Sequence, residues 1–241
     1  MRVAIVSDIH GNIRGLDACL SDLEQQGGAD FIVGAGDFCM DGPRSPEVLE
    51  RLRELGAYCI RGNTDREIAD DPSKYDDETA EDIRFQRALI GDEGIEWLRS
   101  LPATVSFGDP SNALLVCHAN PCNDTEHVWP DASDMQLERL FGDVQASAIA
   151  FGHLHLPYVR MWRGKLLVDV ASAGLPKDGD ARANYAILTE RPGGWEVKLR
   201  RVAFDVDEVA RELEKSGIPH LEKRLDTLRG HRYKELGTVI P

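Results

Sequence analysis

The stretch that decides the fold is MRVAIVSDIHGN, residues 1–12. Its apolar run, 3–6, predicts a short buried β-strand. The chain turns polar directly after this strand, and Asp8 and His10 follow within four residues. A strand that runs into Asp-x-His places groups able to bind metal at the carboxyl end of a sheet. The rest of the sequence shows whether other strands end in the same way.

Apolar strands alternate with amphipathic helices through the first 60 residues. Strands are predicted at 31–33 and 57–60. One helix is predicted around 16–23, where Leu16, Cys19, Leu20 and Leu23 recur at helical spacing. A second helix, over 45–55, is expected to begin with Ser45 as its N-cap, followed by Pro46 in the first turn. This alternation predicts an α/β fold with a parallel sheet and right-handed crossovers.

The pattern changes after residue 65. We expect one domain over 1–241, with a helical cap inserted at about 66–102, helical near 81–89 and 94–98, that overhangs the strand ends. Strands are expected at 114–117 and 148–151, with a helix at 135–141 between them. Four more strands are expected at 158–162, 166–170, 185–188 and 195–202, before two terminal helices within 205–230.

Composition limits the classes of function. The 241 residues include 42 acidic and 28 basic side chains, a net charge of -14, which argues against nucleic acid or an anionic membrane surface as the main partner. No apolar run approaches the roughly 20 residues of a membrane span. Five cysteines without a CxxC motif favour a reducing, cytoplasmic setting. A homo-oligomer is left open.

Side chains that can bind metal follow strand after strand. They are Asp8, His10, Asp37, Asn63, His118, His153 and His155. Because loops at the carboxyl ends of strands in an open α/β sheet converge on one crevice, these seven groups are expected to meet. Seven ligands suffice for two metal ions. The mixture of carboxylate, imidazole and amide suits Mn²⁺, Fe or Zn²⁺ better than Ca²⁺.

Each of these candidate ligands also has an ordinary structural explanation. Asp37 is compatible with a cap or turn, and Asn63 after a glycine with a turn. His118 is compatible with a hydrogen-bonded core histidine. The pair His153 and His155 is more specific, since an extended segment puts both rings on one side. The metal interpretation rests on all of these groups falling at the same kind of position in the fold.

In this order the motifs resemble those of the calcineurin-like metallophosphoesterase superfamily, most of all its small bacterial branch, which includes many phosphodiesterases. The resemblance rests on Asp8-Ile9-His10-Gly11-Asn12, Gly36-Asp37 through Gly42-Pro43, Gly62-Asn63, His118 and Gly152-His153-Leu154-His155. It implies a four-layer α/β/β/α sandwich of two mixed β-sheets flanked by helices. It also implies a dinuclear metal site at the carboxyl ends of the strands.

The resemblance further implies the role of each ligand. One metal would be bound by Asp8, His10, Asp37 and His155, and the other by Asp37, Asn63, His118 and His153. Asp37 would bridge the two ions, at a separation of about 3.5 Å. Asp37, Asn63 and His118 are the predicted catalytic residues, and a metal-bridging hydroxide would attack phosphorus without a phosphoenzyme. Manganese or iron is favoured, with zinc or nickel as alternatives.

The sequence departs from the family pattern in two places. Many members carry histidine directly after the metal-binding asparagine, whereas this chain has Thr64, whose hydroxyl is a poor general acid near pH 7. His127 is a candidate replacement or, alternatively, a surface histidine. The run 169–174 differs from the Asn-Pro-Gly-Ser that relatives often have there. Asn12, His127 and Arg182 are the predicted substrate contacts.

These features favour a metal-dependent phosphoesterase that hydrolyses a small phosphodiester or nucleotide. A phosphomonoesterase, including a protein phosphatase, is the second interpretation, and the absence of histidine at position 64 weighs against it. A metal-binding scaffold without catalysis is the third, and the complete ligand set weighs against it.

Overall fold

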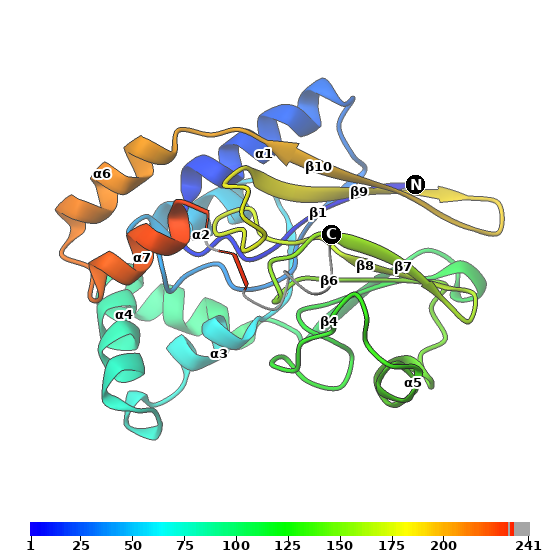
Figure 1. Ribbon diagram of the computed structural model, residues 1–241, viewed down its shortest axis with the longest axis horizontal. Helices are drawn as coiled ribbons and strands as arrows, with labels where there is room; N and C mark the ends of the chain where they lie inside the picture. Colours follow the sequence, from blue (N-terminus) through cyan, green and yellow to red (C-terminus); the bar gives the residue numbers. More distant parts are fainter. Residues whose placement is uncertain (231, 234–241) are drawn as a thin grey trace.

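Two five-stranded β-sheets face each other in the computed structural model, which describes residues 1–230, 232 and 233 (Figure 1). The first sheet has the order β10 (Gly194–Val202), β9 (Ala183–Arg191), β1 (Arg2–Val6), β2 (Phe31–Gly34), β3 (Tyr58–Cys59). The second has the order β4 (Thr104–Phe107), β5 (Leu114–Cys117), β6 (Ala148–Phe151), β8 (Lys165–Asp169), β7 (Tyr158–Trp162). Both are mixed: β1, β2 and β3 pair in parallel in the first sheet, as do β5, β6 and β8 in the second, whereas the other pairings are antiparallel.

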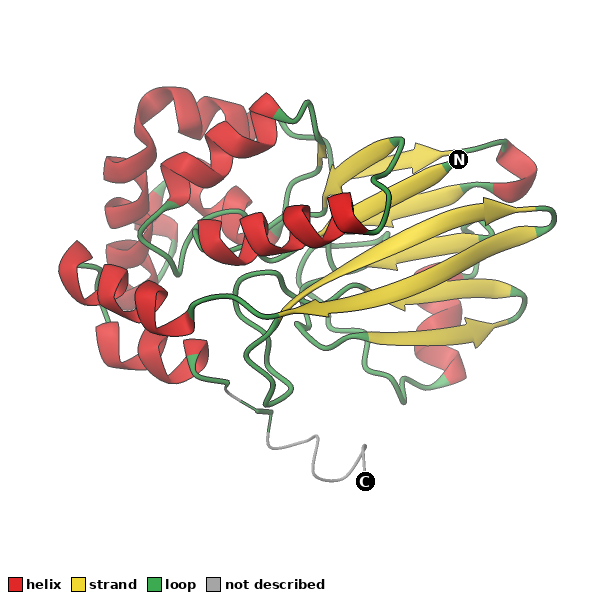
Figure 2. Cartoon of the chain, turned by 90° about the horizontal axis from the view of Figure 1, so that it is seen from above, coloured by secondary structure: helices red, strands yellow, loops and turns green. Residues whose placement is uncertain are grey.

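Most helices gather at one end of the strands (Figure 2). The helices are α1 (Ile13–Gln25), α2 (Ser45–Glu54), α3 (Asn63–Ala69), α4 (Asp77–Ser100), α5 (Asp134–Phe141), α6 (Val206–Ser216) and α7 (Leu221–Leu228). Two 3₁₀ turns cover Pro72–Lys74 and Pro110–Asn112. None of the helices in the described part of the chain combines the length and apolar character needed to cross a bilayer.

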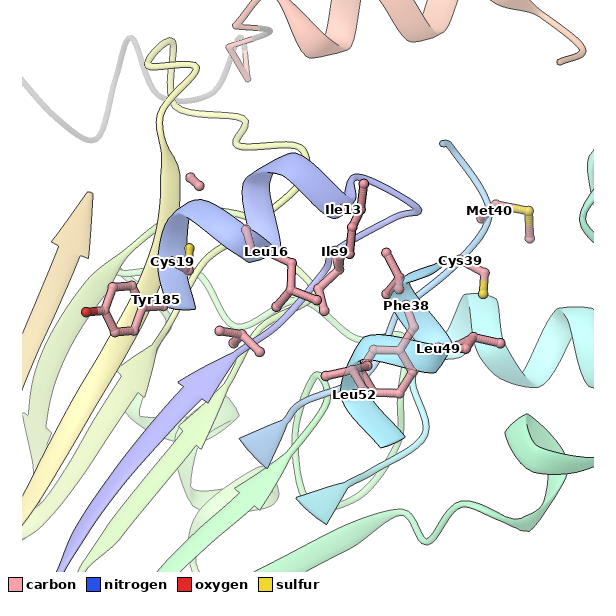
Figure 3. Close-up of a cluster of buried hydrophobic side chains, with 14 of the residues drawn as sticks. Ile9, Ile13, Leu16, Cys19, Phe38, Cys39, Met40, Leu49, Leu52 and Tyr185 are labelled. Atoms are coloured by element: carbon pink, nitrogen blue, oxygen red, sulfur yellow. The ribbon is translucent and has the colours of Figure 1, made fainter. Parts of the chain in front are cut away.

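Alternating side chains of the central strands build three buried layers. Val3 and Ile5 of β1 point between the sheets and pack in one cluster with Val116 of β5. Ala4 and Val6 point the other way and join the cluster beneath α1 and α2. Figure 3 shows this second cluster, which contains Leu16, Cys19, Phe38, Leu49, Leu52 and Tyr185. On the far side α5 packs on the second sheet, and the predicted four-layer sandwich is confirmed.

The expected helices and strands are all present, with small shifts in their bounds. The N-cap prediction at Ser45 is wrong, because Ser45 is the first residue of α2 and Arg44 occupies the cap position. The hydroxyl of Ser45 donates instead to Gln86 Oε1 at 2.6 Å. Strand β4, which has four residues and pairs with β5, was not predicted from the sequence.

The segment 66–102 is helical and is part of the core. A single element, α4, spans the region where two helical stretches were expected, and it is interrupted at Gly91 (φ 65°, ψ -178°). Ile83 and Leu98 of α4 are fully buried in the cluster under α2. The helix therefore stabilises the end of the sandwich that carries the polar loops.

Candidate metal centre

Loops from both sheets bring the seven predicted ligands to one place. Asp8, His10, Asp37 and Asn63 follow β1, β2 and β3 of the first sheet, and His118, His153 and His155 follow β5 and β6 of the second. Six of them form two groups whose ligand atoms lie within 4.8 Å of one another: Asp8, His10 and His155, and Asp37, His118 and His153. The predicted convergence of strand ends is therefore present in the structure.

A carboxylate oxygen of Asp37 lies between the two groups. Asp37 Oδ2 is 3.4 Å from His118 Nε2 and 3.8 Å from His10 Nε2. In the first group, Asp8 Oδ1 is 3.1 Å from His155 Nε2. The Nε2 atoms of His10 and His155 are 3.2 Å apart. Five potential ligand atoms thus face a common space.

Each carboxylate uses one oxygen for the main chain and leaves the other for this space. Asp37 Oδ1 accepts the Thr64 N–H at 2.9 Å, and Asp8 Oδ2 accepts the His153 N–H at 2.9 Å. Asp8 Oδ1 is buried and accepts no hydrogen bond from the described residues. A buried carboxylate oxygen needs a partner, and a cation between the two groups fits that need.

The four histidines are oriented with one ring nitrogen inward. The outer nitrogen contacts a main-chain carbonyl oxygen in each: His10 Nδ1 to Cys39 (3.1 Å), His118 Nδ1 to Ala35 (2.8 Å), His153 Nε2 to Thr125 (2.9 Å) and His155 Nδ1 to Leu175 (2.5 Å). A carbonyl only accepts, so these partners fix a proton on the outer nitrogen, and the inner nitrogen is the one that a metal ion would bind. Histidines that bind metal in proteins are held in this way.

Asn63 completes the second group. The end of its amide that faces the centre lies 2.9 Å from His153 Nδ1, 3.1 Å from His118 Nε2 and 3.3 Å from Asp37 Oδ2. All three neighbours are acceptors. An amide nitrogen there would donate to them, whereas an amide oxygen there fits a cation held between the four groups.

The main chain at the site is held in an unusual conformation. Five of the seven residues have left-handed φ angles: Asp8 (52°), His10 (50°), Asp37 (55°), His153 (66°) and His155 (59°). Such angles cost non-glycine residues roughly 1–2 kcal/mol each. Strain of this kind is concentrated at functional sites, where the surrounding structure enforces it.

Two buried carboxylates give the centre its negative charge. Burial opposes ionisation of Asp37, but the positive charges of protonated His118 and His10 outweigh it and lower the pKa of this carboxyl below its usual range. Although burial opposes this, Asp37 in turn raises the pKa of His118 to about 10. Burial also opposes ionisation of Asp8, and His155 and two further histidines lower its pKa. Both carboxyls are therefore ionised at neutral pH, and a cation is the natural counter-charge.

Asp65 is a positioning residue that the sequence analysis missed. Its carboxylate accepts the main-chain N–H groups of Asp37 (2.8 Å), Phe38 (3.0 Å) and Gly62 (3.0 Å). It thereby ties the loop that carries Asp37 to the start of α3. Burial, with the nearby Asp37, raises the pKa of Asp65 to about 7. Asp65 lies in the first turn of α3, a helix that was not predicted from the sequence.

Ser172 acts in the same way behind the first group. Its hydroxyl donates to the Asp8 carbonyl oxygen at 2.6 Å and accepts the Leu175 N–H at 2.6 Å. Leu175 in turn offers its carbonyl to His155. The segment that departs from the family pattern thus holds one candidate ligand directly and another through its neighbour.

Two further side chains near the centre have different surroundings. The half-buried ring of His127 stacks on His153, with centroids 4.6 Å apart. Burial, with a smaller effect of the charge of Lys177, lowers the pKa of His127. Cys39 points its thiol into the core beneath α1 and α2, so only its main-chain carbonyl reaches His10.

The other two predicted substrate contacts have structural partners. The Asn12 side chain accepts the Gly15 N–H and donates to the Gly174 carbonyl, both at 3.0 Å, and so caps α1. Arg182 is exposed and pairs with Asp180 at 2.6 Å. Of the three predicted substrate contacts, His127 is the one with a described contact to a candidate ligand.

A cavity of about 300 Å³ adjoins the second group at His118. Its wall includes Arg61, Arg66 and the loop residues 120–124. The Arg66 guanidinium makes two hydrogen bonds to the Asp124 carboxylate, at 2.7 and 3.2 Å. The charge of Arg66 is therefore offset by Asp124, and Arg61 is a second cationic side chain in this wall.

Comparison with known proteins gives consistent matches. The family model of the calcineurin-like phosphoesterase superfamily domain matches residues 1–192. An uncharacterised protein of Methanocaldococcus jannaschii is 28% identical over 239 residues, covering 90% of this chain and 93% of its own. A metallophosphoesterase of Sphaerobacter thermophilus superposes with a TM-score of 0.79 and 25% identity, covering 94% of this chain and 98% of its own. A hypothetical protein of Pyrococcus horikoshii has a TM-score of 0.83 and 22% identity, with 95% and 99% covered.

Proposed function

Because the chain belongs to the calcineurin-like phosphoesterase superfamily, we propose that it is a metal-dependent hydrolase of a small phosphodiester or nucleotide. The observation that carries the proposal is the orientation of the four histidines. Each donates its outer N–H to a main-chain carbonyl and directs its other nitrogen toward two ionised carboxylates. Four histidines with purely structural roles would not need to share this orientation.

The residues present fit two divalent ions. One would be held by Asp8, His10, Asp37 and His155, and the other by Asp37, Asn63, His118 and His153. Nitrogen and oxygen donors without thiolate favour manganese or iron. When bound, the ions would supply Lewis-acid activation of water and neutralise phosphate charge.

The chain's own residues would position the reacting groups. Asp37 Oδ2, fixed because Oδ1 accepts the Thr64 N–H, would hold both ions in one orientation. His127, stacked on His153, would line the approach to the second ion. Thr64 offers no imidazole, and burial lowers the pKa of His127, so neither of these two side chains is a ready proton donor at neutral pH. This favours diesters with good leaving groups.

The cavity beside His118 supplies a place for the rest of the substrate. Its volume of about 300 Å³ lies at the lower end of the range for small-molecule sites. Arg61 in its wall favours an organic group that carries a further negative charge, as a nucleotide does, whereas Arg66 is already paired with Asp124. Arg61→Gln is expected to raise KM for such a substrate and to leave an uncharged aryl diester unaffected.

A phosphomonoesterase is the second candidate, and the position of His127 favours it. If binding of substrate raised the pKa of this imidazole, it would act as the missing acid. A monoester and a diester with the same nitrophenyl leaving group distinguish the two candidates.

The test is hydrolysis of bis-p-nitrophenyl phosphate and p-nitrophenyl phosphate by the metal-stripped full chain, with and without added Mn²⁺. We expect manganese-dependent turnover of the diester that exceeds that of the monoester. A faster monoester would favour the second candidate. No turnover of either ester with manganese, iron, zinc or nickel would contradict the enzymatic proposal and leave a metal-binding scaffold.

The five cysteines bear on the setting in which the protein works. All five are unpaired, and three of them are buried. We propose a reducing compartment such as the cytoplasm.

A further inference from the structure

His10 differs from the other three histidines in the partner of its outer nitrogen. Besides the Cys39 carbonyl, its Nδ1 lies 3.0 Å from Asp41 Oδ2. A carboxylate at this position accepts the N–H more strongly than a carbonyl does. It thereby makes Nε2 of the imidazole a better electron-pair donor to a metal ion. The loop after Asp37 therefore reaches back to a second candidate ligand.

The second oxygen of Asp41 is held by a residue from the other end of the chain. Asp41 Oδ1 pairs with the guanidinium of Arg224 in α7. Arg224 is only 4% exposed, and it also contacts Asp82 Oδ1 of α4 at 2.5 Å and the Pro219 carbonyl at 3.0 Å. A buried guanidinium needs such partners, because removing its charge from water is costly.

Helix α4 holds the same loop on either side of Asp41. The side-chain nitrogen of Gln86 donates to the carbonyl oxygens of Met40 (2.7 Å) and Gly42 (3.1 Å). Gln86 is fully buried, so these bonds are shielded from water. The main chain around Asp41 is thus fixed by α4, and its carboxylate by α7.

We propose that Arg224 is a positioning residue for the metal centre. It orients Asp41 so that this carboxylate accepts the His10 N–H and keeps the His10 Nε2 lone pair directed at the group of Asp8 and His155. The inference rests on the proposed metal function. It also gives a role to α7, which lies beyond residue 192, where the match to the family model ends.

The test measures metal affinity in the full chain. Metal-stripped wild type, Arg224→Gln and Arg224→Lys are titrated with Mn²⁺, and free manganese is followed by electron paramagnetic resonance. We expect Arg224→Gln to weaken one of the two sites by about 10–100-fold and to leave the other unchanged, as for other lost partners of metal-binding histidines. The manganese affinity of Arg224→Lys, which keeps the positive charge, should lie between those of wild type and Arg224→Gln.

Glu212→Gln is the matched control. Glu212 anchors α6 to the same side of the molecule through Arg14 and Arg44, both at 2.8 Å, and its described contacts do not include Asp41. We expect both manganese affinities to stay at wild-type values. An equal loss in this control would assign the effect to general loosening of the terminal helices and overturn the proposal.

The proposal is also overturned if folded Arg224→Gln binds both ions with wild-type affinity. If that variant does not fold, Asp41→Asn tests the proposal in its place. This variant keeps an acceptor for His10 but loses the ion pair with Arg224. We expect a smaller loss at one site, and no loss would contradict the proposal. Wild type that binds none of manganese, iron, zinc and nickel would instead overturn the proposed function itself.

Discussion

Asp37 makes contacts within the site through both carboxylate oxygens and through its main chain. One carboxylate oxygen accepts the Thr64 N–H, the other faces His118 and His10, and the main-chain N–H is held by Asp65. A Cβ on Gly62 would come within 2.1 Å of Asp37 Oδ1, which explains why glycine precedes Asn63. The sequence predicted the role of Asp37 as a bridge, but not the contacts that orient it.

Replacing Asp37 by asparagine should remove the charge shared by both metals. We expect Asp37→Asn to lower diester turnover by about a thousandfold or more, equivalent to about 4 kcal/mol. Circular dichroism should show an intact fold, because the residue lies in a loop. Asp180→Asn, at a carboxylate paired with exposed Arg182, is the control and should retain wild-type turnover. An Asp37→Asn enzyme with a tenth of wild-type turnover at saturating manganese would refute the bridging role.

A second prediction at the residue scale concerns the leaving group. Because neither Thr64 nor His127 is a ready acid, the rate should depend steeply on the pKa of the leaving group, so nitrophenyl esters (pKa about 7) should far outpace alkyl esters (above about 15). Burial lowers the pKa of His127, which keeps this ring neutral at pH 7. His127→Gln should therefore leave the leaving-group dependence unchanged.

A leaving-group series on both proteins measures this dependence. If His127→Gln steepened it, with a loss approaching the hundredfold of a general acid, His127 would be the proton donor. Thr64→His is a poorer test, because Thr64 is only 9% exposed and its hydroxyl is buried, so an imidazole would have to displace its neighbours.

Among the elements, the strands other than β4 were predictable, and the contacts of α4 were not. Apolar runs such as 114–117 and 148–151 end where β5 and β6 end, since period and polarity are local properties. The left-handed angles at Asp8 and His10 and the tertiary role of Gln86 depend on residues far away in the chain. Local patterns carry no information on such pairings.

Gln86 gives the prediction for α4. Gln86→Leu should leave the buried carbonyls of Met40 and Gly42 and the hydroxyl of Ser45 without their partner. We expect a loss of about 2–3 kcal/mol in the free energy of unfolding, measured by urea denaturation. Asp92→Ala, an exposed change on the same helix, should alter it by less than about 0.5 kcal/mol. A neutral Gln86→Leu would show that α4 does not hold the loop.

At the scale of the whole molecule, the two sheets meet so that each supplies part of the site. The first sheet gives Asp8, His10, Asp37 and Asn63, and the second gives the other three ligands. The sequence predicted this sandwich through its ordered motifs. It did not predict that α7 returns to the site through Arg224, because an ion pair between residues 183 positions apart leaves no periodic signal.

The central claim is that this sandwich holds two metal ions in one centre. The most direct measurement is the number of manganese ions bound per chain, by equilibrium dialysis of metal-stripped protein followed by elemental analysis. We expect saturation at about two ions per chain, because the seven candidate ligands, with the carboxylate of Asp37 shared, would complete two sites. Saturation at one ion or at none, with circular dichroism showing a folded protein, would contradict it.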